Sequence, residues 1–207
     1  MSTRIPAVPS AMRKSPRQAR SQATVQAIVT AAARILGERG WAGFTTNAVA
    51  ALAGVSIGSL YQYFPDKRAL VDAVRRAHTD DVLAAMDRAL AGTQPLARRA
   101  DLLVRGLVAA HSVHPGLHRV LLDASPRHAP GDAAQADVEA RLLAGYDVLA
   151  GQSAGGPKAS RRARAQVLAD AVDGVIHNAA RRGTLQSPRL RRELVRLICA
   201  QLVPGGG

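Results

Sequence analysis

Residues 44–67, FTTNAVAALAGVSIGSLYQYFPDK, decide the fold of this chain because they encode two short helices joined by a tight turn. Thr45 is a good N-cap for a first helix that runs through Leu52, with Val49 and Leu52 facing inward. Gly54 follows where the turn needs a positive φ, which glycine adopts at little cost. The stretch therefore predicts a helix-turn-helix.

The second helix of the pair is short, with a small, hydroxyl-rich and aromatic outer face. Ser56 can cap it, and Pro65 closes it within about two turns. Leu60 and Phe64 form its predicted buried side. A helix of this kind fits a DNA major groove, which is about 12 Å wide. The residues predicted to face outward are Ile57, Gly58, Ser59, Tyr61, Gln62 and Tyr63.

Two further features of this stretch favour contact with DNA. The absent side chain of Gly58 lets the backbone approach phosphates or base edges. Asp66 caps the next helix and places Lys67 in its first turn, where the ammonium and the helix dipole together favour a phosphate. Trp41 is expected to pack between the first helix of the chain and the rest.

The stretch resembles the DNA-binding motif of TetR-family repressors, and the resemblance covers roughly residues 17–70 without a gap. A weaker resemblance to the C-terminal domains of that family lies in HPGLHRVLLD, residues 114–123. The matching positions are Thr45-Thr46, Val49-Ala50, Ala53-Gly54-Val55-Ser56, Gly58, Leu60-Tyr61, Tyr63-Phe64-Pro65 and Lys67-Arg68-Ala69-Leu70.

The resemblance implies a set of DNA contacts. Thr46 and Tyr63 would hydrogen-bond phosphates, and Lys67 would hold one by its charge. Arg17 and Arg20 would reach the DNA backbone or an adjacent minor groove. The tyrosine ring at position 61 can alternatively pack inward while its hydroxyl reaches a phosphate. The residues implied to face base edges are Ile57, Gly58, Ser59 and Tyr61, and Thr45 and Asn47 complete the predicted DNA-binding set.

Ile57 departs from the family pattern, in which a polar or basic residue is common at this position. Isoleucine neither donates nor accepts a hydrogen bond, so it can at most touch a thymine methyl. Sequence specificity is then expected to depend more on Ser59, on Asn47 and on DNA shape.

The rest of the chain predicts an all-α protein of about nine helices. Apolar residues recur at spacings of three and four, and no window alternates as a strand does. A first helix is expected over 17–39, ended by Gly37 and Gly40, and a short one over 117–122. The predicted domains are a flexible basic arm (1–16), a three-helix DNA-binding domain (17–66) and a helical effector-binding and dimerisation domain (67–207).

The positive charge is concentrated at the N-terminal end. Residues 1–78 hold 11 Lys and Arg against three acids, a balance of +8, while residues 79–207 hold 17 against 12, a balance of +5. Such an excess is typical of a module that binds a polyanion. The alternative is a coding bias toward arginine, which makes up 25 of the 28 basic residues.

The last two predicted helices, over 165–182 and 189–202, carry apolar faces without an obvious partner inside one chain. Ser187-Pro188 opens the last of them as an N-cap and first helical residue. The resemblance implies that these helices form a four-helix bundle across a homodimer axis. The alternative is that the faces complete the core of the monomer.

The central helices, from about 80 to 180, are the expected effector domain, since the resemblance implies a small-molecule pocket there. Asp173 and His177 lie four residues apart and can pair on one helix face. The spacing of the three histidines 111, 114 and 118 fits a metal site poorly, because Pro115-Gly116 ends the helix before the third. The candidate effector-binding residues are His111, His114, His118, Tyr146, Asp173 and His177.

The sequence contains no catalytic motif, no cofactor motif and no apolar run long enough to span a membrane. The N-terminus has no secretory signal, so a cytoplasmic protein is expected. The single cysteine, Cys199, is expected to be a small buried hydrophobe rather than half of an intermolecular bridge. These features predict a homodimeric repressor that binds operator DNA and is released by a small apolar ligand. The alternatives are a non-specific DNA-coating protein and a TetR-like regulator without an effector.

Overall fold

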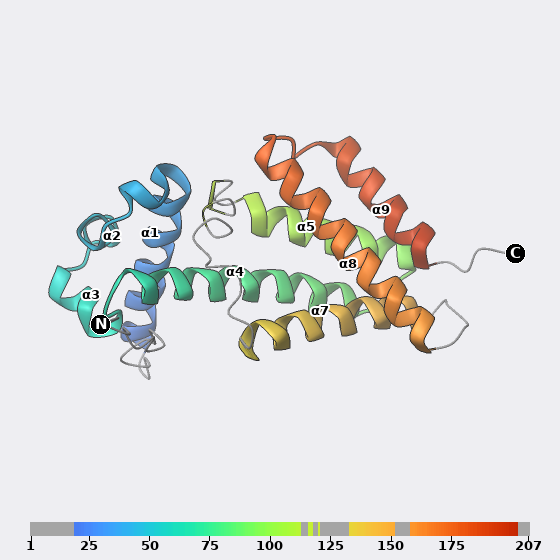
Figure 1. The fold of residues 1–207 in the computed structure, drawn as a ribbon, viewed down its shortest axis with the longest axis horizontal. Helices are drawn as coiled ribbons and strands as arrows, with labels where there is room; N and C mark the ends of the chain where they lie inside the picture. Colours follow the sequence, from blue (N-terminus) through green and yellow to red (C-terminus); the bar gives the residue numbers. More distant parts are fainter. Residues whose placement is uncertain (1–18, 113–115, 118–119, 121–132, 152–157, 203–207) are drawn as a thin grey trace, which may run out of the picture. The chain divides into compact units, whose positions relative to one another are not determined.

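The computed structural model describes residues 19–112, 116–117, 120, 133–151 and 158–202, and every regular element in these ranges is a helix (Figure 1). The all-α prediction is therefore confirmed, and the short helix expected over 117–122 lies largely outside the described residues. The helices are α1 (Ala19–Gly43), α2 (Thr46–Ala53), α3 (Ile57–Tyr63), α4 (Lys67–Leu90), α5 (Leu96–Ser112), α7 (Ala133–Gly151), α8 (Lys158–Arg181) and α9 (Pro188–Leu202).

The chain divides into two compact units, residues 1–77 and 78–207, and the division falls within α4. In the first unit α1 packs on α2, and α2 packs on α3. The core of this unit is aliphatic with two buried phenylalanines. Its side chains with less than 2% exposure are Ile28, Ala32, Ile35, Leu36, Phe44, Val49, Leu60, Phe64, Ala69, Leu70 and Val74.

Helix α1 continues past the glycines that were expected to end it. The helix runs to Gly43, with a kink at Gly40, whose φ is +64°. This conformation is open to glycine and strained for other residues. The predicted end at Gly37 is therefore wrong, whereas Gly40 does interrupt the regular helix.

Helix α2 has the predicted start and a slightly different inward face. Val49 is fully buried as expected, but Leu52 is 45% exposed, so its inward placement is wrong. Burial centres on Val49 and Ala50. Because successive residues are about 100° apart around the helix axis, Leu52 points to a different side of α2 from Val49 and Ala50, and reaches solvent.

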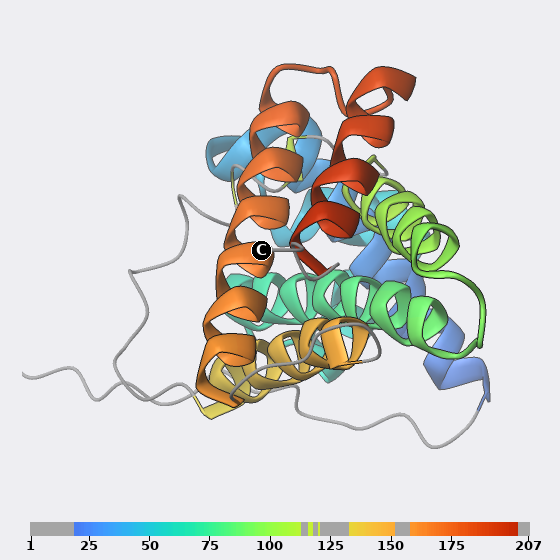
Figure 2. The same cartoon turned by 90° about the vertical axis from the view of Figure 1, so that its right-hand side faces the viewer.

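The second unit contains α5, α7, α8, α9 and the C-terminal part of α4 (Figures 1 and 2). Helix α7 packs against α8, and α5 packs against α9. Gly106 lets α5 approach α4 closely, since a Cβ atom there would lie 2.5 Å from the Cβ of Ala85. The buried side chains include Met86, Leu103, Tyr146, Leu149, Leu168, Val172, Ile176, Leu194, Ile198 and Leu202.

The apolar faces of α8 and α9 are mostly used inside this unit. Leu168, Val172 and Ile176 of α8, and Leu194 and Ile198 of α9, are each at most 2% exposed. The expectation that these faces lack a partner within one chain is therefore wrong for most of their residues. The fold buries them against α4, α5 and α7, whose own apolar stripes belong to the same core.

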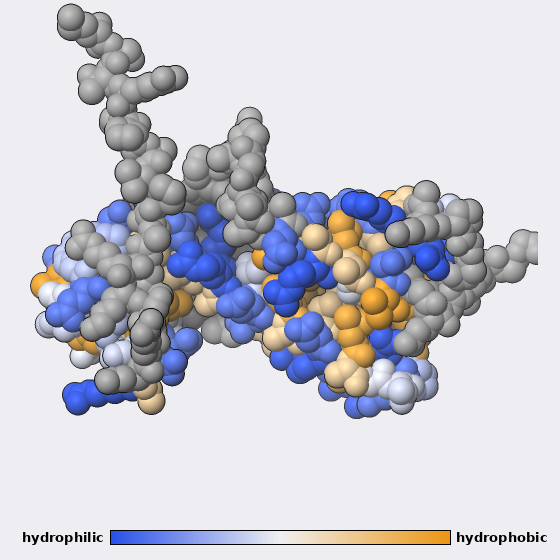
Figure 3. Space-filling view, turned by 90° about the horizontal axis from the view of Figure 1, so that it is seen from below, coloured by the Kyte–Doolittle hydropathy of each residue, from blue (hydrophilic) through white to orange (hydrophobic). Residues whose placement is uncertain are grey.

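Some apolar surface remains uncovered on the second unit. Val148 on α7 is 49% exposed and Val167 on α8 is 59% exposed. Apolar residues gather on the face of this unit that Figure 3 shows. None of the helices in the described part of the chain combines the length and the apolar character needed to cross a bilayer.

Candidate functional site

The turn between α2 and α3 is fixed by local hydrogen bonds. Thr45 Oγ1 accepts a bond from the Ala48 amide at 3.1 Å, and so caps α2. Gly54 ends α2 in the left-handed region, with φ at +68°. Ser56 Oγ accepts a bond from the Ser59 amide at 3.0 Å and caps α3. Thr45 and Ser56 therefore act as the predicted N-caps, and Gly54 forms the predicted turn.

Helix α3 presents a mixed apolar and hydroxyl face to solvent. Ile57 is 39% exposed and Tyr61 is 42% exposed, while Leu60 and Phe64 are fully buried. Gly58 is exposed, and a Cβ there would meet only Ser56 Oγ, at 3.9 Å. The fold itself thus leaves room for a side chain at position 58.

Two hydroxyl pairs lie on the α2–α3 surface. The hydroxyls of Thr46 and Tyr61 are hydrogen-bonded at 3.2 Å and join the two helices. The hydroxyls of Ser56 and Ser59 are hydrogen-bonded at 2.8 Å. Each pair can still direct a donor or a lone pair outward. The tyrosine at position 61 therefore has its hydroxyl positioned by a residue that is itself a predicted phosphate contact.

Tyr63 differs from its prediction. Its side chain is only 8% exposed and belongs to the core of the first unit, so the expected outward placement is wrong. The reason is helical spacing, because residues 60, 63 and 64 share one face of a helix with 3.6 residues per turn. The phosphate contact that the family resemblance implies for Tyr63 stays a prediction that would depend on its hydroxyl alone.

Lys67 lies in the first turn of α4, as predicted. The Ala69 amide donates to Asp66 Oδ1 at 2.9 Å, which caps the helix beside it. Lys67 Nζ lies 5.1 Å from the centre of the Trp41 ring and 5.8 Å from that of Phe44. These cation–π contacts hold the ammonium near the start of α4. Trp41 packs against Phe44, with ring centres 6.0 Å apart, and against Lys67 of α4, although 46% of the residue stays exposed.

The remaining predicted DNA contacts lie on the surface of the first unit or outside the described residues. Thr45 and Asn47 are exposed at the start of α2, and Arg20 is exposed at the start of α1. Arg17 lies outside the described residues. Residues 45–67 thus bring the exposed Gly58, the two hydroxyl pairs and the ammonium of Lys67 into one short segment.

The second unit encloses a cluster of histidines. The ring centres of His78 and His111 lie 4.7 Å apart, and those of His111 and His177 lie 5.2 Å apart. His111 Nδ1 donates to the Leu107 carbonyl at 2.8 Å. His177 Nδ1 lies 2.8 Å from Asp173 Oδ2, so the predicted pairing of these two residues is present.

Burial dominates the electrostatics of this cluster. Burial first, and then the neighbouring His111 and His177, lower the pKa of His78 to about 4, while Asp173 acts to raise it. Burial also lowers the pKa of His111. The pKa of Tyr146 is raised by burial and by Asp173. At physiological pH the imidazoles of His78 and His111 are therefore neutral.

The structure brings together four of the six predicted effector-binding residues, namely His111, Tyr146, Asp173 and His177. The ring of His177 contacts that of His111 and pairs with Asp173, whose charge also acts on Tyr146. His114 and His118 lie outside the described residues. His78 was missed, although its position four residues after Val74 and four before Val82 places it on the apolar stripe of α4. Among the described residues, no group of three His, Cys, Asp or Glu has the geometry to hold a metal ion.

Two family models match the chain. The model described as "Bacterial regulatory proteins, tetR family" matches residues 28–74, which include α2 and α3. The model described as "Tetracyclin repressor-like, C-terminal domain" matches residues 95–202. A comparison with curated proteins finds no match.

Solved structures of similar fold carry the same family name. A TetR-family transcriptional regulator from Streptomyces coelicolor is 23% identical, with a TM-score of 0.60, over 86% of this chain and 97% of that one. A putative TetR-family regulator from Mesorhizobium loti MAFF303099 is 19% identical, with a TM-score of 0.68, over 89% of this chain and 98% of that one.

A structure titled "SmeT-Triclosan complex" is 22% identical, with a TM-score of 0.63, and covers 89% of this chain and 94% of that one. At these identities the likenesses show a shared fold. The C-terminal family model alone covers more than half of the 207 residues, and the N-terminal model coincides with the helix-turn-helix. The chain therefore belongs to the TetR family of bacterial transcriptional regulators.

Proposed function

We propose that the chain is a homodimeric, sequence-specific repressor that binds operator DNA through α3 and the start of α2. The observation that carries this proposal is the outer face of α3. Ile57, Gly58 and Tyr61 are exposed on a helix of seven residues whose other side is fixed in the core. A small, rigid and exposed helix face is what a major groove admits.

In this proposal the phosphate contacts come from the hydroxyls of Thr46 and Tyr61 and from the ammonium of Lys67. Thr46 and Tyr61 would bind backbone oxygens on one side of α3, and Lys67 would bind one at the start of α4. Asn47 and Ser59 would read base edges, with Ile57 against a thymine methyl. Arg17 and Arg20 would add charge from the start of the chain.

Binding to the chain's own upstream DNA and to random DNA of equal length tests this proposal. We expect the upstream DNA to bind at least 100-fold more tightly, with both affinities falling as salt is raised. Equal affinities across the salt series would contradict the repressor and support the alternative, a protein that coats DNA through its charge.

The proposed dimer forms through the two C-terminal helices, α8 and α9, with the exposed Val167 of α8 in the interface. An exposed apolar patch on a folded unit is a candidate interface. Val167→Asp should shift the chain toward monomer in sedimentation experiments, since a carboxylate would be buried at the interface. Ala51→Asp is the matched control, because residue 51 is an exposed alanine of α2 in the first unit. An unchanged Val167→Asp dimer would place the interface elsewhere.

The proposed effector is a small molecule bound in the second unit beside the histidine cluster. Buried neutral histidines and Tyr146 offer hydrogen bonds within an aliphatic core. The triclosan complex of a fold relative supports a small-molecule ligand for this architecture. Control of DNA binding requires the ligand to prefer the DNA-incompetent state. A thermal-shift screen followed by operator release tests this, and a screen without any releasing compound would favour a regulator without an effector.

A further inference from the structure

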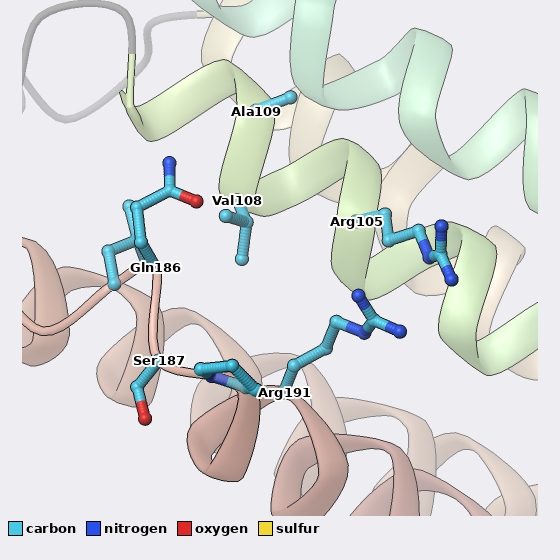
Figure 4. Close-up of a pocket in the computed structure, with 8 residues that line it drawn as sticks. Arg105, Val108, Ala109, Gln186, Ser187 and Arg191 are labelled. Atoms are coloured by element: carbon cyan, nitrogen blue, oxygen red, sulfur yellow. The ribbon is translucent and has the colours of Figure 1, made fainter.

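A groove of about 330 Å³ lies between α5 and the beginning of α9, within the second unit (Figure 4). This volume is at the lower end of the range of about 300–1,000 Å³ that is usual for small-molecule sites. The residues that line the groove combine an apolar floor with polar ends. They are Arg105, Val108, Ala109, Leu185, Gln186, Ser187, Pro188 and Arg191.

Two polar bridges hold the walls of the groove. Gln186 Nε2 donates to Ser112 Oγ at 2.7 Å, and joins the α8–α9 connection to the end of α5. Arg191 Nε donates to Asp101 Oδ1 at 2.9 Å, and joins α9 to an earlier turn of α5. The apolar floor at Val108 lies between the two bridges. The width of the groove is therefore set before any ligand arrives, which lowers the entropy cost of binding.

Positive charge collects at one end of the groove. Asp101 also accepts from Arg105 Nε at 2.9 Å, and Arg98 Nη1 lies 3.7 Å from its Oδ2. One carboxylate thus faces three guanidinium groups, which leaves an excess of two positive charges. No lining residue is acidic. The end of the groove is therefore electrostatically suited to an anion.

The geometry of the arginines leaves donors for that anion. Arg105 and Arg191 both use Nε to bind Asp101, so the Nη atoms of each guanidinium can bind a second acceptor. Figure 4 shows the two side chains extending toward each other from α5 and α9. The N-terminal end of α9 is capped by Ser187, whose Oγ accepts a hydrogen bond from the Leu190 amide at 3.4 Å. Recognition of the anion would thus come from the two arginines.

We propose that this groove binds a small organic anion with an apolar body, such as a medium-length carboxylic acid. The carboxylate would lie on the Nη atoms of Arg105 and Arg191, and the body would cover Val108, Ala109 and Pro188. The groove lies in the second unit alone, so its ligand can be measured without DNA and independently of the operator proposal.

Calorimetric titration of the full chain with octanoate tests the proposal, with octan-1-ol and inorganic phosphate as comparison probes. We expect octanoate to bind at least tenfold more tightly than either probe, because only octanoate supplies both the carboxylate and the apolar body. No binding of octanoate at millimolar concentration would overturn the proposal. Equal binding of octanol, or equal binding of phosphate, would overturn it as well, since the site would then recognise only one half of the ligand.

Variants test whether octanoate occupies this groove. Arg191→Gln and Arg105→Gln should each weaken octanoate binding at least fivefold. Arg98→Gln is the matched control, since it removes an equal charge from the same Asp101 network outside the lining, and its effect should stay within twofold. Ala109→Phe should also weaken binding at least fivefold by filling the groove at an exposed position without changing its charge. A uniform loss in all three arginine variants, or full binding by Ala109→Phe, would overturn the assignment.

Discussion

The two units of this chain use polar groups in opposite ways. In the first unit, hydroxyls and an ammonium lie at the surface of short capped helices, where water can replace each partner. In the second unit, three histidines and a tyrosine lie buried or half-buried among the helices, where fewer water molecules can replace their partners. Removing a surface group should therefore change binding with little change in stability, whereas perturbing a buried group should change stability first.

The largest expected effect is the loss of stability of the second unit on acidification. The pKa of His78 is about 4 in the folded chain and 6.5 as the ordinary value. Between these two pH values the unfolded chain binds more protons, so the free energy of unfolding falls as the pH falls from 6.5 to about 4. The full loss is about 3 kcal/mol, of which about 1.4 kcal/mol is present by pH 5.5.

Urea unfolding at pH 7.5 and pH 5.5 measures this loss, and His78→Gln identifies its source. The variant should lose less stability over the same interval, because the neighbouring His111, whose pKa is also lowered, remains as a contributor. Asp173 and His177 face the same cluster and are unchanged in the variant. An equal pH response in both chains would show that His78 is not the group that resists protonation.

The next effect in size comes from filling a close helix contact in the second unit. Gly106→Ala would place a Cβ 2.5 Å from the Cβ of Ala85 and 3.2 Å from its Cα. The helices must then move apart at a cost of about 3 kcal/mol, which the better helix propensity of alanine offsets by about 1 kcal/mol. Chemical unfolding should show a net loss of about 2 kcal/mol.

Gly145→Ala is the matched control for that contact. Its added Cβ would meet Met86 Cγ and Sδ at 2.5 and 2.7 Å. A methionine side chain can change rotamer, so the net change should stay below about 1 kcal/mol. A loss as large as that of Gly106→Ala would mean that Met86 is as rigid as a backbone contact.

The sequence made the first unit more predictable than the second for a physical reason. Caps and turns are local, so Thr45, Gly54, Ser56 and Asp66 could be assigned from their neighbours along the chain, and each acts as expected. Tyr63 was misplaced although it shares one helix face with Leu60 and Phe64, because the phosphate contact that the family resemblance implies favoured an outward side chain.

Contacts between residues that lie far apart in the sequence could not be predicted from the sequence. The cluster joins histidines from α4, α5 and α8, and nothing local says that His78 faces His111 rather than solvent. The single carboxylate of Asp101 likewise gathers Arg191 from 90 residues away, through the packing of α5 on α9. Asp173 and His177 could be paired in advance only because one helix carries both.

A smaller effect is expected on the DNA-binding surface, and on binding rather than stability. Lys67→Ala should weaken operator binding by about 1–2 kcal/mol and reduce the slope of log affinity against log salt by about 1, since one phosphate contact is lost. Tyr61→Phe should give a smaller loss, because only the hydroxyl shared with Thr46 is removed.

Fluorescence anisotropy across a salt series measures both variants, with thermal melting as the check on folding. Arg34→Ala is the control, because its charge is already paired with Glu38 at 2.8 Å in the same unit. If Lys67→Ala keeps the wild-type salt slope, the ammonium over Trp41 serves only the packing of the first unit.

The smallest effect on stability, and the sharpest contrast with Gly106, is expected at Gly58. A methyl group there would meet only Ser56 Oγ at 3.9 Å, and the φ of this residue is one that any residue adopts. Gly58→Ala should therefore leave the first unit equally stable or raise its stability by up to about 1 kcal/mol, through better helix propensity. Operator affinity should nevertheless fall, because the added methyl group stands between the backbone of α3 and the DNA.

Thermal melting measures the stability of the Gly58→Ala chain, and fluorescence anisotropy on the same sample measures its operator affinity. Unchanged affinity would remove position 58 from the DNA interface and shift the reading of bases to Ser59 and Ile57.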